Sequence, residues 1–366
     1  MGKSISEGFI EEVPASELSG PEGRRWFLPI FPVQQPRKNK VRIVYDASAR
    51  FKGTSLNDNL LSGPNLNNDL RGVLQRFREE KIAFVADIMS MFNNFHITPE
   101  FRDMTRFFWF KDNDSNKDIV QFRAVGHVFG CTSSPGVAAY CLKFATHLPY
   151  AQTYEKGGQY IRSSMYIDDG LSSAATPEEA VKTLQEATKI LGNCNIRLHK
   201  YMSNSREVLA ALPPSEIAEG CHFIDNSADP IPSQRALGVY WDPESDTFKF
   251  QVSIPNKPFT KRGILATINS LWDPIGAISP VTLAAKLIQR QILPKKEDMT
   301  PELTACGWDD ELPHKYRQRW EDWKSTLTGL VSIELPRCFI PKDFVDANRE
   351  LYVFLDASQD GIGYCI

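Results

Sequence analysis

The sequence predicts an α+β fold, and three features of the chain predict it. Residues Ile82 to Ala86 form an apolar run of strand length that ends at an acid, Asp87. Asp168 and Asp169 stand side by side between two short segments, 160–165 and 170–173, which we expect to be strands joined by a tight turn. Two further segments carry the spacing and capping signals of helices. The expected order is therefore strand, helix, hairpin, helix.

The two expected helices have clear starting signals. The first follows Ser134, a suitable N-cap, and has Pro135 at its first position. Its apolar residues share one face and continue to about His147. The second begins at a capping box, 176–179, with proline at its first helical position, and Gly192 ends it.

The acids are the strongest candidates for chemistry. Two adjacent carboxylates at a turn repel each other and cost stability unless a cation holds them. Alone, an Asp-Asp pair is more often a solvated turn than a metal site. Together with the strand-end carboxylate of Asp87, the pair Asp168–Asp169 can hold two hard divalent cations through oxygen ligands.

The composition is that of a globular protein with a sizeable core. The chain has 366 residues, enough for two or three domains, and 42% of them are hydrophobic. Its apolar runs fall short of the roughly 20 residues that a membrane helix needs, so we expect no membrane partner. The 7 cysteines are scattered and never spaced as C-x-x-C, which argues for a reducing compartment without a disulfide framework or zinc site.

One stretch of the chain has the charge expected for a nucleic-acid partner, although the net charge of −3 does not. Between Arg24 and Lys52 there are eight basic residues and a single acid, Asp46, with five aromatic residues among them. Basic side chains neutralise phosphates, and aromatic faces support bases. By charge alone, a solvated basic loop is an equal alternative.

Three motifs resemble those of reverse transcriptases, and they follow the same order. Residues 87–92, 129–135 and 166–169 resemble motifs A, B and C. A wider set resembles the polymerase region of the BEL/Pao class of long-terminal-repeat retrotransposons, from about Glu11 to the last residue. This set comprises residues 41–48, 53–58, 203–209, 237–239 and 273–276.

The resemblance implies a right-hand polymerase followed by the beginning of an RNase H domain. Strand, helix, hairpin and helix are what a palm domain needs. The implied divisions are fingers with a basic loop (1–82), palm with motif A (83–111), further fingers with the motif B helix (112–150), palm with motif C and a primer-grip hairpin (151–250), thumb and connection (251–345), and a truncated RNase H start (346–366).

The resemblance also implies a two-metal site. Asp87 and Asp168 are expected to bridge both ions, Asp169 to be a looser ligand, and the backbone carbonyl of Ile88 to supply a further oxygen. Mg²⁺ is the expected metal because all of these ligands are hard oxygens, and Mn²⁺ is the expected substitute.

Several residues match the family's contacts to the incoming nucleotide and the primer. Arg42 matches the arginine that clamps the triphosphate, and Lys40, Lys38 or Arg37 is expected to add a second cation. Phe92 matches the aromatic that blocks a 2′-hydroxyl. For Phe92, an ordinary core aromatic is the alternative, and both roles are compatible. Gly130 matches the motif B glycine, and Lys200 matches the motif D lysine that protonates pyrophosphate. Leu237 and Gly238 match the primer grip. Phe129 replaces the glutamine that retroviral enzymes have before this glycine, which leaves that glutamine's sugar contact in doubt here.

The end of the chain resembles the first strands of an RNase H domain. Residues 351–358 resemble the first strand, with Asp356 as its first catalytic acid, and Asp360-Gly361 is expected to turn into a second strand at 362–366. Because one acid cannot hold two metals, we expect no RNase H activity from this chain.

The implied function is RNA- and DNA-templated DNA synthesis for a retrotransposon. The implied partners are an RNA or DNA template with its primer, deoxynucleoside triphosphates, and the protease, RNase H and integrase parts of a polyprotein outside this chain. The family implies a cytoplasmic virus-like particle, with the nucleus as an alternative location. Two other functions stay open: an RNA-templated RNA polymerase, which Tyr166-Ile167 and Ser90-Met91 fit poorly, and a relic that binds nucleic acid without turnover.

Overall fold

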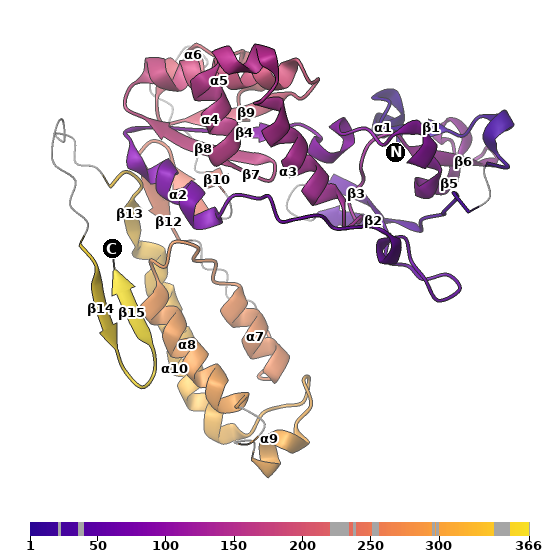
Figure 1. Cartoon of the computed structure of the whole chain (residues 1–366). Helices are drawn as coiled ribbons and strands as arrows, with labels where there is room; N and C mark the ends of the chain where they lie inside the picture. Colours follow the sequence, from indigo (N-terminus) through magenta and orange to yellow (C-terminus); the bar gives the residue numbers. More distant parts are fainter. Residues whose placement is uncertain are drawn as a thin grey trace.

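A computed structural model describes residues 1–20, 23–35, 40–219, 234–236, 239–250, 256–294, 297, 300–339 and 352–365. The fold is mixed α/β, as the sequence predicts, and its strands form several small antiparallel sheets (Figure 1). Among the described residues, no helix is both long and apolar enough to cross a membrane.

The acids lie on a four-stranded antiparallel sheet with the order β7-β8-β4-β9. Its strands are β4 (Ile82–Ile88), β7 (Met165–Tyr166), β8 (Asp169–Ala174) and β9 (Leu198–Ser203). Alternate residues of β4 enter two cores: Phe84, Ala86 and Ile88 join one, and Ala83 and Val85 join the other. The apolar run at 82–86 is therefore continuous because both faces of the strand are buried.

Helices cover both faces of this sheet. On one face lie α3 (Ser134–Ala145), α4 (Glu155–Ser163), α5 (Pro177–Gly192) and α6 (Arg206–Ala210). On the other lies α2 (Leu70–Glu79) (Figure 1). The capping box at 176–179 is confirmed, because the Thr176 side chain accepts from the Glu179 amide. Helix α3 begins one residue earlier than predicted and ends two earlier, and the Ser134 hydroxyl donates to the Val128 carbonyl instead of capping.

The predicted strand at 160–165 is wrong. Residues up to Ser163 belong to α4, and only Met165 and Tyr166 are in a strand. The reason is packing against α5. The amide of Gly157 donates to the Glu186 carboxylate, and a Cβ at Gly157 would lie 2.4 Å from the Ala187 nitrogen. This close approach of two helices overrides the β-branched and aromatic residues of the segment.

A separate β-rich region, at the right in Figure 1, precedes and follows β4 in sequence. It contains α1 (Gly2–Ser6), a three-stranded sheet and a hairpin. The sheet has the order β1 (Ile10–Glu12), β6 (Ile119–Ala124), β5 (Arg106–Phe110), and the hairpin pairs β2 (Ile30–Gln35) with β3 (Lys40–Tyr45). The predicted cations Arg37 and Lys38 lie outside the described residues.

A further four-stranded sheet consists of β10 (Gln234–Ala236), β11 (Val239–Asp242), β12 (Thr247–Lys249) and β13 (Glu334–Pro336). Between β12 and β13 the chain forms a helical region with its own core. Its helices are α7 (Lys261–Asn269), α8 (Ser279–Ile292), α9 (Pro301–Ala305) and α10 (Arg317–Thr326).

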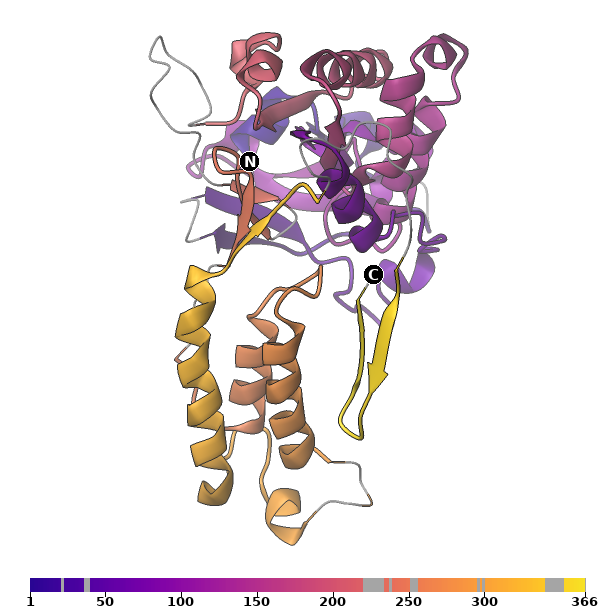
Figure 2. The ribbon, with the colours of Figure 1, turned by 90° about the vertical axis from the view of Figure 1, so that its left-hand side faces the viewer.

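The chain ends in a hairpin of β14 (Phe354–Ala357) and β15 (Ile362–Cys365), drawn in yellow beside the helical region in Figure 2. Both predicted strands are therefore present. Short 3₁₀ helices complete the described elements. They are Ala15–Glu17, Asn57–Asn59, Met91–Asn94, Pro99–Thr105, Lys111–Asn113, Pro149–Thr153, Pro214–Glu216, His314–Tyr316 and Leu327–Ser332.

Candidate active site

The three predicted acids meet at one end of the β7-β8-β4-β9 sheet. Asp87 on β4 is directly opposite Asp169 on β8. Asp168 precedes Asp169 in the turn, and its carbonyl accepts from the amide of Ile88 at 2.8 Å. Asp87 and Asp169, 82 positions apart in sequence, therefore lie side by side because β4 and β8 pair in this register.

The turns around the acids have unusual backbone angles. Tyr166 pairs with Asp169, which leaves Ile167 and Asp168 as a two-residue loop, and Ile167 has φ +58°. A β-branched residue in this left-handed region is strained, and such turns usually place glycine there. Ser90 (φ +51°) and Lys200 (φ +52°) also have left-handed angles. Strain of this kind gathers at functional sites.

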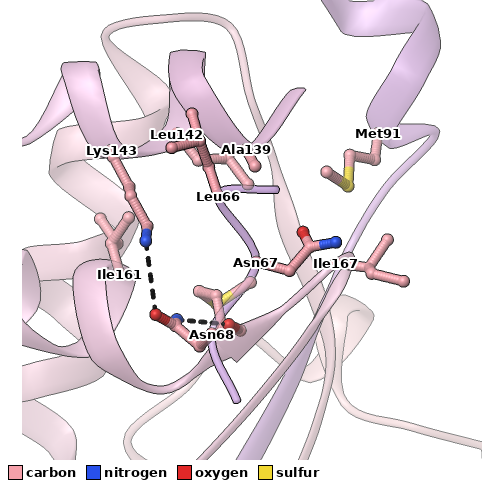
Figure 3. A pocket seen from close by; sticks show the side chains of 10 residues that line it. Leu66, Asn67, Asn68, Met91, Ala139, Leu142, Lys143, Ile161 and Ile167 are labelled. Atoms are coloured by element: carbon pink, nitrogen blue, oxygen red, sulfur yellow. Dashed lines mark hydrogen bonds between the residues drawn. The ribbon is translucent and has the colours of Figure 1, made fainter. Parts of the chain in front are cut away.

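A polar support lies beside the strained turn (Figure 3). The Asn68 amide donates to the Met165 carbonyl at 2.7 Å and accepts from Lys143 at 3.4 Å. Ile167, Met91 and these residues line a small cavity of about 20 Å³. The cavity is too small for a nucleotide. We therefore assign these contacts to holding the turn in place.

Asp87 is compensated by two bases on β9. Its Oδ1 lies 3.2 Å from Nε2 of His199, and its Oδ2 accepts from the Lys200 ammonium. Burial alone would raise the pKa of Asp87, but the hydrogen bonds from His199 and Lys200 outweigh it. The pKa of Asp87 is consequently below its ordinary value, and the group stays ionised.

Asp168 has the opposite electrostatic environment. Burial raises its pKa, and the nearby Asp87 carboxylate raises it further, while Lys200 and Arg42 oppose the rise. Two acids of one site thus differ in how readily they ionise. The negative charge on Asp168 is only partly compensated, which makes this position attractive to a cation.

The donor set suits a hard divalent cation, because three carboxylates and the carbonyls beside them are all oxygen ligands. In the described residues, no group of three or more His, Cys, Asp or Glu side chains is arranged to hold a metal ion. The ammonium of Lys200 instead holds one oxygen of Asp87. A metal that used this oxygen would take the place of a positive charge that the protein itself supplies.

An aromatic pair and an arginine stand beside the acids. Phe92 lies in the 3₁₀ helix after β4 and is 9% exposed, so its ring is part of the core. Its ring meets the edge of Phe129, with the two centroids 4.7 Å apart. The guanidinium of Arg42, from the β2–β3 hairpin, lies over the ring of Phe129, with its Cζ 5.6 Å from the ring centroid.

Gly130 is required by its surroundings. It has φ +111°, and a Cβ at this position would lie 2.1 Å from the carbonyl oxygen of Tyr45. The side chain of Asn57 holds the same loop from both ends. Its amide donates to the Gly130 carbonyl at 2.9 Å, and its oxygen accepts from the Thr132 amide at 2.9 Å. The loop that follows Phe129 is thus fixed.

The other predicted site residues are further away or not described. Asp356 lies on the exposed β14, and its carboxylate accepts from the Ala357 amide. Lys40 is the first residue of β3, and Leu237 and Gly238 fall outside the described residues, between β10 and β11. Sequence reasoning gave no role to Asn57 or His199. The one available signal was that Asn57 lies inside a motif that resembles the family.

Comparison with known proteins supports a retroelement relationship. Residues 260–366 match the family described as Pao retrotransposon-like RNaseH-like domain. No curated protein matches the sequence. A solved structure of the foamy viral protease-reverse transcriptase dRH in complex with ds DNA is similar to this chain, with a TM-score of 0.53 and 15% sequence identity.

The structural similarity extends over most of this chain but not over most of the viral protein. It covers 89% of this chain and 46% of that chain. At this identity, the similarity concerns the fold. The chain therefore has a mixed α/β fold similar to that of a retroviral reverse transcriptase, with a Pao retrotransposon-like RNaseH-like match at its C-terminal end.

Proposed function

We propose that this chain is an RNA- and DNA-templated DNA polymerase that extends a primer with deoxynucleotides, as in BEL/Pao retrotransposons. The observation that carries the proposal is that Asp87, Asp168 and Asp169 meet at one end of a sheet. Its strand β4 is buried on both faces, and the turn beside the acids is strained. A nucleotide polymerase needs such an acid cluster, because its reaction is an in-line displacement at a phosphate.

We also propose that the chain has the right-hand arrangement of a polymerase. The β7-β8-β4-β9 sheet with its helices would be the palm, the β-rich region with the β2–β3 hairpin the fingers, and the helical region of α7, α8 and α10 the thumb and connection. In support, the solved structure with a similar fold is a reverse transcriptase complexed with double-stranded DNA. The partners we propose are accordingly a primer–template duplex and deoxynucleoside triphosphates.

Asp87 and Asp168 would hold two Mg²⁺ ions, with Asp169 as a looser ligand and the Ile88 carbonyl nearby. Bound Mg²⁺ lowers the pKa of the primer 3′-hydroxyl and neutralises charge on the leaving oxygens. Lys200 must first leave Oδ2 of Asp87 before that oxygen is available. Its ammonium would then lie beside the site and supply a proton to the departing pyrophosphate. Arg42 would bind the triphosphate through its planar guanidinium.

Replacement of Asp168 by asparagine tests the proposal. We expect Asp168→Asn to lower the rate of homopolymer primer extension by roughly 10³-fold or more, because a ligand charge is lost. Asp118→Asn makes the same chemical change at an exposed position and should extend like the parent. Equal extension by Asp168→Asn and the parent would contradict the assignment.

Thermal unfolding gives a readout that does not need turnover. Because burial and the Asp87 carboxylate raise the pKa of Asp168 in the fold, its ionisation lowers the stability from the unfolded pKa of about 4 upward, and the loss is complete once the pH exceeds the folded pKa. Asp168→Asn should therefore be at least as stable as the parent at pH 7, and the difference should vanish in acid. Added Mg²⁺ should raise the melting temperature of the parent more than that of the variant. A parent chain that binds primer–template but never extends it would indicate the nucleic-acid-binding relic.

A further inference from the structure

The ring of Phe129 joins two residues of the proposed nucleotide site that come from different parts of the chain. It meets Phe92 edge-to-face at 4.7 Å and an interplanar angle of 79°. It also lies under the guanidinium of Arg42, whose Cζ is 5.6 Å from the ring centroid. Phe92 follows β4, whereas Arg42 belongs to the β2–β3 hairpin. Phe129 is therefore in contact with a residue of each of these two elements.

Phe129 is not simply a core residue. It is 45% exposed, and thus much of one large apolar ring faces solvent beside the acids. Burial alone gives little reason for a phenylalanine at such a position. Its backbone is nevertheless fixed, because Asn57 bonds to Gly130 and Thr132 immediately after it. An exposed ring on a fixed loop is suited to positioning its neighbours.

Arg42 depends on this ring for its placement. Within the described part of the chain, no carboxylate lies within 4.0 Å of its guanidinium, so no ion pair holds it. It is close enough to Asp168 to oppose the rise of that group's pKa. The attraction between the guanidinium and the face of Phe129 therefore keeps a free cation beside the acids.

We propose that Phe129 is a positioning residue that orders Arg42 for the triphosphate and supports Phe92 as the wall beside the sugar. The inference rests on the proposed polymerase function and extends it. An arginine held before the nucleotide arrives loses less side-chain entropy on binding, so Phe129 favours nucleotide affinity. A ring supported at its edge moves less, so Phe129 also favours rejection of ribonucleotides.

The test compares Phe129→Leu with Phe129→Tyr. Leucine keeps an apolar side chain but removes the π face, whereas tyrosine keeps the ring. For Phe129→Leu we expect the KM for deoxynucleotides to rise roughly three- to tenfold with kcat nearly unchanged, because a cation–π contact is lost. Ribonucleotide use relative to deoxynucleotide use should rise by a similar factor, because the aromatic pair is lost. Phe129→Tyr should keep both the KM and the relative ribonucleotide use at the values of the parent.

Phe144→Leu is the matched control. Phe144 is 50% exposed and stacks on Tyr140 at 5.8 Å, so the same substitution removes a comparable aromatic contact on α3. It should leave the KM and the ribonucleotide ratio unchanged. If Phe129→Leu behaves like Phe144→Leu while the parent extends primers, the positioning role is wrong and the polymerase assignment stands.

A measurement without turnover tests the positioning role of Phe129 even if the chain is not a polymerase. Ring current from Phe129 should shift the side-chain proton resonances of Arg42 upfield in an NMR spectrum of the parent. This shift should disappear in Phe129→Leu and remain in Phe144→Leu. Arg42 resonances that do not change between the parent and Phe129→Leu would overturn the inference, whether or not the protein extends primers.

Discussion

At the residue scale, measurement can separate the role of Phe92 in the core from its proposed role as the wall beside the sugar. Its ring belongs to the core with Met91 and Phe95, and it also faces Phe129 at the site. A hydrophobic pocket without a rigid wall rejects an added hydroxyl only about 100-fold, so stronger selection requires a side chain that cannot move aside. The packed surroundings of Phe92 meet this requirement.

We predict that Phe92→Val will admit ribonucleotides while it largely spares the kcat for deoxynucleotides. The measurement is the ratio of kcat/KM for the two substrates, taken below the melting temperature, since truncation of a buried phenylalanine costs up to about 3–5 kcal/mol. Phe95→Val is the control: Phe95 is equally buried in the same core, and its loss should affect stability but not the ratio. An unchanged ratio in Phe92→Val would show that Phe92 does not block the 2′-hydroxyl.

The residue scale also shows what a sequence can and cannot reveal about this site. The acids could be located because each stands at the end of an apolar run or in a short turn, and both signals are local. The role of Asn57 could not, since its partners Gly130 and Thr132 are 73 and 75 positions away. The contact of Phe129 with Arg42 likewise depends on how the β2–β3 hairpin meets the motif B loop.

At the scale of elements, the prediction from sequence succeeded where the signal lies within one element. The α5 capping box and the buried strand β4 are examples. It failed for α4, whose residues favour a strand but whose Gly157 allows a close approach to α5. The deciding interaction was between elements, and the local sequence does not contain it.

Buried charges join the elements of the β-rich region, and they give a prediction on stability. Asp103 accepts from Arg106 and from Arg123, and all three side chains are almost fully buried. Burial would raise the pKa of Asp103, but the two guanidinium groups lower it below its ordinary value. The ionised carboxylate therefore stabilises the fold above the unfolded pKa of about 4, and this stabilisation is lost as the pH falls through the folded pKa.

Asp103→Asn should accordingly lower the free energy of unfolding by about 3–5 kcal/mol at pH 7, because it removes the carboxylate that pairs with the buried Arg106 guanidinium, whereas Arg123 keeps Glu11 and Glu17. The difference from the parent should shrink as urea unfolding is repeated below about pH 4. Asp112→Asn removes an exposed partner of Lys117 and should change little. A difference that stays constant with pH would mean that packing, not charge, makes Asp103 important.

At the scale of the whole molecule, one arginine ties the part that carries the acids to the segment that returns from the helical region. Arg337 is fully buried, immediately after β13. Its guanidinium binds both carboxylate oxygens of Asp246 at 2.6 and 2.8 Å. It also donates to the carbonyls of Phe77, Glu80 and Lys81, where α2 ends and β4 approaches. Three segments far apart in sequence thus share one side chain.

Replacement of Arg337 by lysine should loosen this connection. An ammonium cannot bind Asp246 in two places and reach three carbonyls as well, so we expect a loss of about 3 kcal/mol or more and a second unfolding transition. Arg319→Lys changes an exposed arginine that bonds to Gln291 on α8, and it should unfold like the parent.

The same variant connects stability to the proposed function. If the helical region grips the duplex, a looser attachment should shorten the products of Arg337→Lys in primer extension, whereas addition of the first nucleotide, which depends on the acids, should be nearly unaffected. Product length and the rate of first-nucleotide addition, measured on the same primer–template with a trap present, would distinguish a weaker grip on the duplex from a damaged acid site. A parallel fall of both quantities would show that Arg337 supports the acid site itself, through β4, and not the grip on the duplex.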